Sequence, residues 1–275
     1  SIFAKVLLLT NFLITQDWLL DNLNNTDVKI LDIRSPMEYK LGHIPNAIFF
    51  PYEKILAFSQ NQTHFEVASK EQIVNFLSEI GIQNEDTVVI YGDKGGTTAT
   101  RLFWTLEMHG LNVKLLDISF SYWASQSLPT TDEISPVKSS NFVSSFSNNH
   151  TVDYEYVLSK VNDSNTILLD NRSPDEFSGL IAAGPKPGRI PNSVNLPWDV
   201  LCGGTDYIFK NIDSMKQILE SKNITPDKEI ICYCQVGERS SHTFLGLKLL
   251  NYDKAKLYDH SYSEWSNIDT LPVEV

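Results

Sequence analysis

Short apolar runs alternate along the chain with longer stretches in which apolar positions recur at helical spacing. The runs at 28–33, 87–92 and 113–118 are bounded by turn residues, which is typical of strands buried on both faces. Helical spacing occurs at 15–23, 69–81, 98–110, 153–161, 211–223 and 240–250. This alternation predicts an α/β fold with a mostly parallel sheet, helices on both faces, and functional loops at the carboxyl ends of strands.

The sequence also repeats itself, with four blocks returning in the same order. Residues 30–55 return at 168–200, where the offset grows from 138 to 146 and so marks an insertion of eight residues. Residues 88–111 align with 229–252, which places Asp93 opposite Cys234, and 117–129 aligns with 259–272. The repeat predicts a tandem duplication of a domain-sized unit, and hence two similar α/β domains.

The domain boundaries follow from this repeat. We expect an N-terminal domain over 1–130, a polar Ser/Asn-rich linker over 131–148, and a C-terminal domain over 149–275. The apolar stretch 1–14 is interrupted by charge and is too short to span a bilayer. We therefore expect it to be part of the fold rather than a signal peptide or a membrane anchor.

Composition narrows the function classes. The formal net charge of −12 makes nucleic acid a poor partner, because phosphate binding needs clustered Lys and Arg. The chain has 42% hydrophobic and 20% charged residues, as in a soluble globular protein, and we expect no membrane partner. Its three cysteines, an odd number, argue against a disulfide framework and favour the reducing cytoplasm. We expect a monomer.

The candidate chemistry lies in the segment CYCQVGERSSHT, residues 232–243. A zinc site is disfavoured because the two cysteines lack the usual spacing and no second Cys/His pair is nearby. A disulfide between Cys232 and Cys234 is disfavoured because alternate strand residues point to opposite faces. We expect Cys232 to be buried in a strand, and neither a metal nor a cofactor at this site.

Cys234 stands where a predicted strand ends and a helix begins. Backbone N–H groups without helical partners, the helix dipole, a turn at Gly237 and the charge of Arg239 would all favour a thiolate there. A buried structural cysteine is the alternative. Cysteine phosphatases carry five residues between Cys and Arg, whereas this loop has four, so it suits a single sulfur atom better than a phosphoryl group. A phosphatase or an arsenate reductase is the less favoured enzyme class.

Four motifs together resemble the rhodanese family, in particular its two-domain thiosulfate and 3-mercaptopyruvate sulfurtransferases. They are LDIRSP with LDNRSP, GHIPNA with GRIPNS, the loop CQVGER, and the terminal SYSEW. The resemblance covers nearly the whole chain, and the loop is of the prokaryotic C-x-x-G-E-R type. It implies two rhodanese-like domains, of which only the C-terminal one is catalytic. Asp93, at the nucleophile position of the first copy, agrees with this.

The resemblance also implies a mechanism. Cys234 would take a sulfur atom from a small anionic donor as a persulfide and pass it to cyanide or a thiol. The resemblance implies that substrate contacts come from the arginine of the DNRSP motif and from the loop: Arg172, Gln235, Val236, Gly237, Glu238 and Arg239. Pairing of Arg239 with a carboxylate such as Glu176 is the structural alternative for that side chain, and Asp170 would orient its own loop.

The two residues after Cys234 leave the identity of the sulfur donor open. In this family, basic residues after the cysteine favour thiosulfate and a Gly-Ser pair favours mercaptopyruvate, but this loop has Gln235 and Val236. We expect thiosulfate from the overall loop type. The alternatives are 3-mercaptopyruvate as donor, or a persulfide carrier that serves a partner protein.

Overall fold

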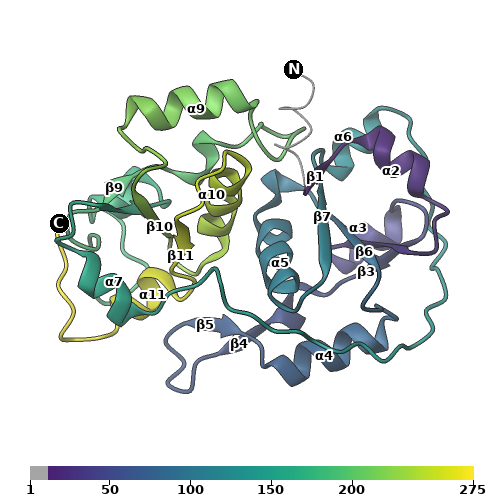
Figure 1. The fold of residues 1–275 in the computed structure, drawn as a ribbon, viewed down its shortest axis with the longest axis horizontal. Helices are drawn as coiled ribbons and strands as arrows, with labels where there is room; N and C mark the ends of the chain where they lie inside the picture. The colour runs from purple at the N-terminus through teal and green to yellow at the C-terminus, as the bar shows by residue number, and fades with distance from the viewer. Residues whose placement is uncertain (1–11) are drawn as a thin grey trace. The chain divides into compact units, whose positions relative to one another are not determined.

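The computed structural model describes residues 12–275 and divides into two compact units (Figure 1). Unit 1 comprises 12–57, 67–149 and 203–209, and unit 2 comprises 58–66, 150–202 and 210–275. In the described part of the chain, no helix has the length and apolar character needed to cross a membrane. Of the expectation that 1–14 belongs to the fold, only the final residues can be followed, since 1–11 lie outside the described residues.

Unit 1 is built on a parallel sheet with the strand order β1-β7-β6-β2-β3. Its strands are β1 (Leu13–Ile14), β2 (Val28–Asp32), β3 (Ala47–Phe49), β6 (Thr87–Tyr91) and β7 (Asn112–Leu116). The helices are α2 (Gln16–Asn22), α3 (Pro36–Leu41), α4 (Lys70–Glu79), α5 (Thr97–Met108) and α6 (Phe120–Ser125). Two 3-10 turns, η1 (Tyr52–Ile55) and η2 (Lys94–Gly96), complete the unit.

Successive residues of these strands point to opposite faces, so each face of the sheet has its own helices. Leu19 of α2, Tyr39 of α3 and Trp123 of α6 share one hydrophobic cluster with Ile30 and Val89 of the sheet. On the other face α5 packs against β6 and β7, and Figure 1 shows it running beside β7. The prediction of a parallel sheet covered on both faces is therefore confirmed for this unit.

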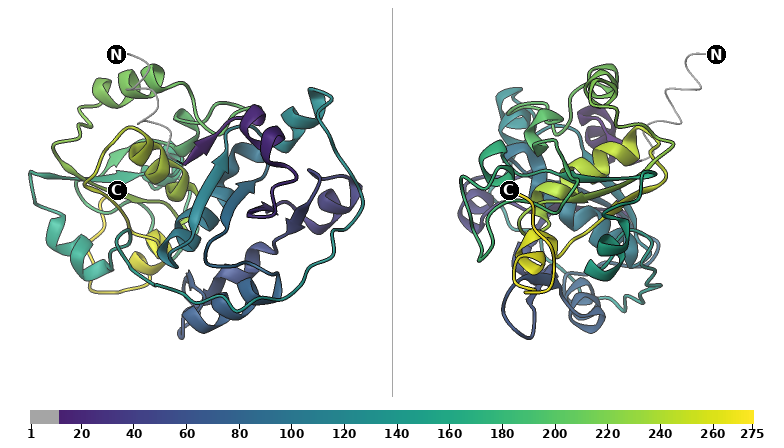
Figure 2. Two further views of the ribbon diagram at one scale, coloured as in Figure 1. Left: turned by 45° about the vertical axis from the view of Figure 1, so that its right-hand side comes forward. Right: turned by 90° about the vertical axis from the view of Figure 1, so that its left-hand side faces the viewer.

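Unit 2 repeats the plan with a parallel sheet ordered β11-β10-β8-β9. Its strands are β8 (Thr166–Asp170), β9 (Val194–Asn195), β10 (Glu229–Tyr233) and β11 (Ala255–Leu257). The helices are α7 (Tyr154–Lys160), α8 (Pro174–Phe177), the 3-10 turn η3 (Trp198–Val200), α9 (Ile212–Ser221), α10 (Glu238–Leu249) and α11 (Ser261–Trp265). Helix α10 packs on β10 and β11. Figure 2 gives two further views of the ribbon.

The duplication is visible in single hydrogen bonds. Trp123 and Trp265 are both fully buried, and each indole N–H donates to the carbonyl of a later proline, Pro129 at 2.9 Å and Pro272 at 2.8 Å. Ser35 and Ser173 each begin a short helix with a proline and close a capping box with a glutamate three residues on. The same residues form the same local structures because both copies keep them at the same spacing.

Two segments depart from a simple cut near residue 130. Residues 58–66 pack with unit 2, and residues 203–209 pack with unit 1. The first segment forms most of a hairpin between β4 (Leu56–Phe58) and β5 (Phe65–Val67). The stretch predicted as a linker, 131–148, belongs to unit 1, where Ser140 N–H donates to Ser78 and Ser145 N–H to His109. It is extended chain held by backbone hydrogen bonds.

Candidate active site

Cys234 follows the last residue of β10 directly, and α10 begins four residues later at Glu238. Gly237 is the N-cap of α10 with φ +85°, the left-handed region that favours glycine. A Cβ on Gly237 would lie 2.3 Å from both the carbonyl oxygen and Oδ1 of Asp259. The expected turn at Gly237 is thus present, and it tightens the chain around the cysteine sulfur.

The sulfur of Cys234 is fully buried and receives two hydrogen bonds from its own loop. The backbone N–H of Gly237 donates to Sγ at 3.2 Å, and the hydroxyl of Ser240 donates at 3.4 Å. Both donors sit at the N-terminal end of α10, where the helix dipole also favours negative charge. The geometry is that of a pocket for an anionic sulfur, with preorganised donors.

Ser261 supports this loop from a different element. Its hydroxyl oxygen accepts the backbone N–H of Cys234 at 3.1 Å, and its own hydroxyl donates to the carbonyl of Tyr258 at 2.9 Å. Ser261 has φ +58°, an uncommon conformation for a residue with a side chain. This contact was not predicted from the sequence, because Ser261 lies 27 residues from Cys234.

Arg239 pairs with Glu176 through two hydrogen bonds, at 2.7 and 2.9 Å. This confirms the pairing considered from the sequence. Burial raises the pKa of Glu176, but hydrogen bonds from Arg239 and Ser173 outweigh it and lower the pKa from 4.5 to about 2. Burial lowers the pKa of Arg239. The ion pair with Glu176 and the nearby Cys234 sulfur outweigh burial and raise this pKa above its usual value. The guanidinium therefore stays charged and fixed beside the loop.

Arg172 is buried beside Asp170. It is 2% exposed, its Nε and Nη2 donate to Asp170, and Nη2 also donates to the carbonyl of Gly188 at 2.8 Å. Its guanidinium carbon lies 4.1 Å from the ring centre of Tyr262. Arg34 makes the same contacts in unit 1, with Asp32 and Gly42. Arg172 is therefore held by Asp170 as a brace of its loop, and its expected contact with an anionic donor stays a prediction.

The remaining loop residues carry no positive charge. Gln235, Val236 and Glu238 are half-buried. The carbonyl of Gln235 accepts the N–H of Ser263 at 3.0 Å, so its backbone is tied to α11. Cys232, one strand position before Tyr233, is fully buried, and burial raises the pKa of its thiol, which favours the neutral form. The expectation that Cys232 is a strand residue is confirmed.

The strand register corrects the expected match between Asp93 and Cys234. Asp32 pairs with Tyr91 in unit 1 and Asp170 with Tyr233 in unit 2, so the residue after Tyr91 corresponds to Cys234. That residue is Gly92, and its carbonyl accepts an N–H from α6 as the Cys234 carbonyl does from α11, both at 3.0 Å. The expectation was wrong by one position, because four residues separate Gly92 from α5 whereas three separate Cys234 from α10.

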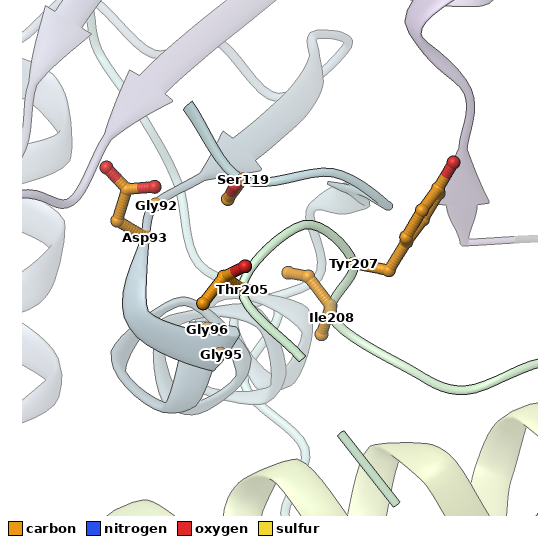
Figure 3. Close-up of a pocket in the computed structure, with 8 residues that line it drawn as sticks. All are labelled: Gly92, Asp93, Gly95, Gly96, Ser119, Thr205, Tyr207 and Ile208. Carbon is orange, nitrogen blue, oxygen red and sulfur yellow. The ribbon is translucent and has the colours of Figure 1, made fainter. Parts of the chain in front are cut away.

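The corresponding loop of unit 1 is closed by other groups. The Asp93 carboxylate accepts the N–H and the hydroxyl of Ser121, at 3.0 and 3.1 Å. Ile208 lies over the loop, where a Cβ on Gly96 would come within 2.7 Å of its side chain. Figure 3 shows Ile208 and Thr205 facing Gly95 and Gly96 across a shallow hollow. Unit 1 thus offers a glycine where unit 2 has its thiol.

Comparison with known proteins gives a family match. A rhodanese-like domain model matches residues 15–126 and again 153–268. A Haloferax volcanii protein named "Putative thiosulfate sulfurtransferase" is 33% identical over 95% of this chain and 96% of its own length. The "Sulfur carrier protein TtuD" of Thermus thermophilus is 29% identical over 95% of each chain.

A solved structure shares the fold. SseA from Escherichia coli, described as a 3-mercaptopyruvate sulfotransferase, superimposes with a TM-score of 0.81 at 24% identity. The match covers 92% of this chain and 99% of that one. At this identity the likeness speaks for the fold alone, and it agrees with two tandem rhodanese-like domains.

Proposed function

Because the chain belongs to the rhodanese family of sulfurtransferases, we propose that Cys234 carries a sulfur atom from an anionic donor to a thiophilic acceptor. The proposed donor is thiosulfate, and the proposed acceptor is cyanide or a thiol. The observation that carries the proposal is the placement of Cys234 Sγ at the start of α10, with the Gly237 N–H and the Ser240 hydroxyl both directed at it.

The proposed reaction consists of two displacements at sulfur. The Cys234 thiolate attacks the outer sulfur of thiosulfate, a new sulfur–sulfur bond forms, and sulfite leaves with the electron pair of the broken bond. Cyanide or a thiolate then attacks the outer sulfur of the persulfide, and the Cys234 thiolate is regenerated. Negative charge stays on sulfur in both steps, so donors that face Sγ can stabilise each state without rearrangement.

The loop residues have separate roles in this proposal. Gly237 and Ser240 supply hydrogen bonds to the sulfur, and Ser261 fixes the backbone of Cys234. Arg239 adds positive charge near Cys234 and, through Glu176, holds the start of α10 against the loop before α8. Gln235, Val236 and Glu238 form the remaining part of the proposed substrate-facing loop. We propose that unit 1 is not catalytic, since Gly92 provides no nucleophile.

A persulfide carrier is the second candidate, and the charge of the loop favours it. Gln235 and Val236 are uncharged, and Arg239 is already paired with Glu176, so the site offers little unpaired positive charge to a thiosulfate dianion. The relative named as a sulfur carrier supports the same alternative. 3-Mercaptopyruvate, with a single carboxylate, is the alternative small donor. None of the three cysteines in the described part of the chain forms a disulfide, and we propose action in the reducing cytoplasm, as a monomer.

Steady-state thiocyanate production with thiosulfate and with 3-mercaptopyruvate tests the enzyme proposal. We expect turnover with thiosulfate by the wild type and by the matched control Cys202→Ser, and none by Cys234→Ser. Cys202 is buried in unit 2 and has no part in the loop, which makes it the appropriate control. Undiminished activity of Cys234→Ser would remove the nucleophile assignment. Persulfide formation without turnover of either donor would favour the carrier.

A further inference from the structure

A second cluster of ionisable side chains lies within unit 2, partly in and beside the SYSEW motif at 261–265. It joins the 58–66 segment to the residues around the start of α11. One ligand atom each from His64, Glu66 and His260 lies within 4.8 Å of the other two. Oε1 of Glu264 is a fourth donor atom, 3.6 Å from His64 Nε2 and hydrogen-bonded to His260 Nδ1 at 3.2 Å.

His64 contributes a buried nitrogen that has no hydrogen bond. The residue is 7% exposed, and its Nε2 atom finds no hydrogen-bond partner although it lies 3.3 Å from Oε1 of Glu66. A buried polar atom left in this way costs free energy unless another group satisfies it. Since the atom faces two carboxylates, a cation is the group that suits both sides.

The hydrogen bonds around Nδ1 of His64 favour the tautomer in which the lone pair is on Nε2. The Thr63 hydroxyl donates to Oδ1 of Asn61 at 2.8 Å, so its oxygen is available to accept from His64 Nδ1, which lies 2.9 Å away. With the proton on Nδ1, Nε2 is unprotonated. Metal-ligating histidines are commonly fixed in this way by a second partner on the other ring nitrogen.

Dimensions and charge fit a small divalent ion. In a tetrahedral site with bonds of about 2.1 Å, neighbouring ligand atoms are roughly 3.4 Å apart, close to the separations around His64 Nε2. The two carboxylates, of Glu66 and Glu264, would balance the double positive charge of such an ion. A hollow of about 350 Å³, lined by Ser59, Gln60, Asn61, His64 and Glu66, gives a path of entry.

We infer that His64, Glu66 and His260, with Glu264 beside them, form a binding site for one divalent transition-metal ion. Nitrogen and carboxylate donors at these separations suit Zn²⁺, whereas Mg²⁺ and Ca²⁺ prefer sites built from oxygen. No metal was predicted from the sequence, because the donors of this cluster are far apart along the chain and lie outside the cysteine segment 232–243. The ion would tie the 58–66 segment to the loop that carries Ser261, the residue that holds the Cys234 backbone.

Zinc titration followed by calorimetry tests this site, using the full chain with Cys234→Ser so that the thiolate cannot bind the metal. We expect one Zn²⁺ per chain and a higher thermal unfolding midpoint with Zn²⁺ than with a chelator. Adding Glu66→Gln or His64→Gln should weaken the affinity by at least about tenfold and remove the thermal shift.

Glu71→Gln is the matched control, since Glu71 is exposed on α4, outside the cluster, and this variant should bind as its parent does. Glu66 is itself 41% exposed at its side chain, so its substitution should leave the fold intact. Absence of Zn²⁺ binding by the parent, or equal binding by the Glu66 and His64 variants, would overturn the inference. Neither result bears on the sulfur chemistry of Cys234, because the measurement is made without that thiol.

Discussion

Glu176 holds the guanidinium of Arg239 through two hydrogen bonds, and it does so from the first turn of α8, where it also closes a capping box with Ser173. One carboxylate therefore serves two purposes: it orders a helix start in the loop after β8, and it fixes the arginine beside Cys234. The pair lets Arg239 position the sulfur loop, and it compensates the charge that a free arginine would offer to an anion.

Replacing Glu176 separates these two effects. Glu176→Gln should lower the free energy of unfolding by about 2 kcal/mol at pH 7, a value between exposed and buried ion pairs. The uncompensated charge of Arg239 should at the same time lower the KM for thiosulfate. Denaturant unfolding measures the change in the free energy of unfolding, and steady-state kinetics measures the change in KM. An unchanged unfolding free energy would show that the pair contributes nothing to stability.

The same pair predicts a pH dependence. The pKa of Glu176 is lowered from 4.5 to about 2 in the folded protein, so its contribution is fully present above pH 4.5 and is lost as the pH falls towards 2. The difference in unfolding free energy between the wild type and Glu176→Gln should shrink over that interval. A difference that stays constant from pH 7 to pH 3 would contradict the lowered pKa.

The carboxyl of Asp117 in unit 1 predicts a pH dependence of stability with the opposite sign to that of Glu176. Burial raises the pKa of its carboxyl from 3.8 to about 6, so the neutral form is favoured in the folded protein. The contribution of the neutral Asp117 carboxyl to the free energy of unfolding is fully present below pH 3.8 and is lost as the pH rises through 6. Asp117→Asn should therefore stabilise the protein by about 1–2 kcal/mol at pH 8 and have little effect near pH 4. Equal effects at both pH values would refute the assignment.

Gly237 offers a test of the loop geometry. In Gly237→Ala the new Cβ would collide with Asp259 in addition to the strain of a positive φ, so we expect at least about 2 kcal/mol of destabilisation and loss of sulfur transfer. Gly204→Ala is the matched control, since Gly204 has φ +82° and no atom within 4 Å of a new Cβ. It should cost about 1 kcal/mol and leave activity intact. Similar losses in both variants would mean that the Asp259 contact is irrelevant.

The corrected match between the two loops can be tested by moving the thiol. In a Cys234→Ser background, Gly92→Cys places a thiol at the equivalent strand position, but its Cβ would lie 2.9 Å from the Ile33 side chain and Ile208 covers the loop. We expect neither Gly92→Cys nor Asp93→Cys to restore thiocyanate production. Activity in Asp93→Cys alone would reinstate Asp93 as the counterpart of Cys234.

The outcome of the sequence analysis differs between local and distant features. The strands, the helices and the turn at Gly237 follow from apolar spacing and from glycine chemistry within a few residues, and the structure confirms them. The pairing of Arg239 with Glu176 was one of two interpretations, because a repeat pattern does not say which carboxylate lies nearest an arginine. Ser261 was missed for a related reason, since only the folded loop brings it to Cys234.

Two features of the chain could not be placed from the repeat alone. The extra residue between Gly92 and α5 shifts the alignment by one position, and only the register of β2 with β6 resolves it. The segments 58–66 and 203–209 are grouped with units 2 and 1, respectively, and no motif in the sequence marks either segment. His64 and Glu66 of the proposed zinc site belong to segment 58–66, so no sequence motif indicates that they lie beside His260.

Mass spectrometry of the intact protein after incubation with stoichiometric thiosulfate tests the central claim most directly. The account predicts one added sulfur atom on the wild type, located on the peptide that contains Cys234 and removed by cyanide, and none on Cys234→Ser. An added sulfur that persists in Cys234→Ser, or that is found on Cys202 or Cys232 instead, would contradict it.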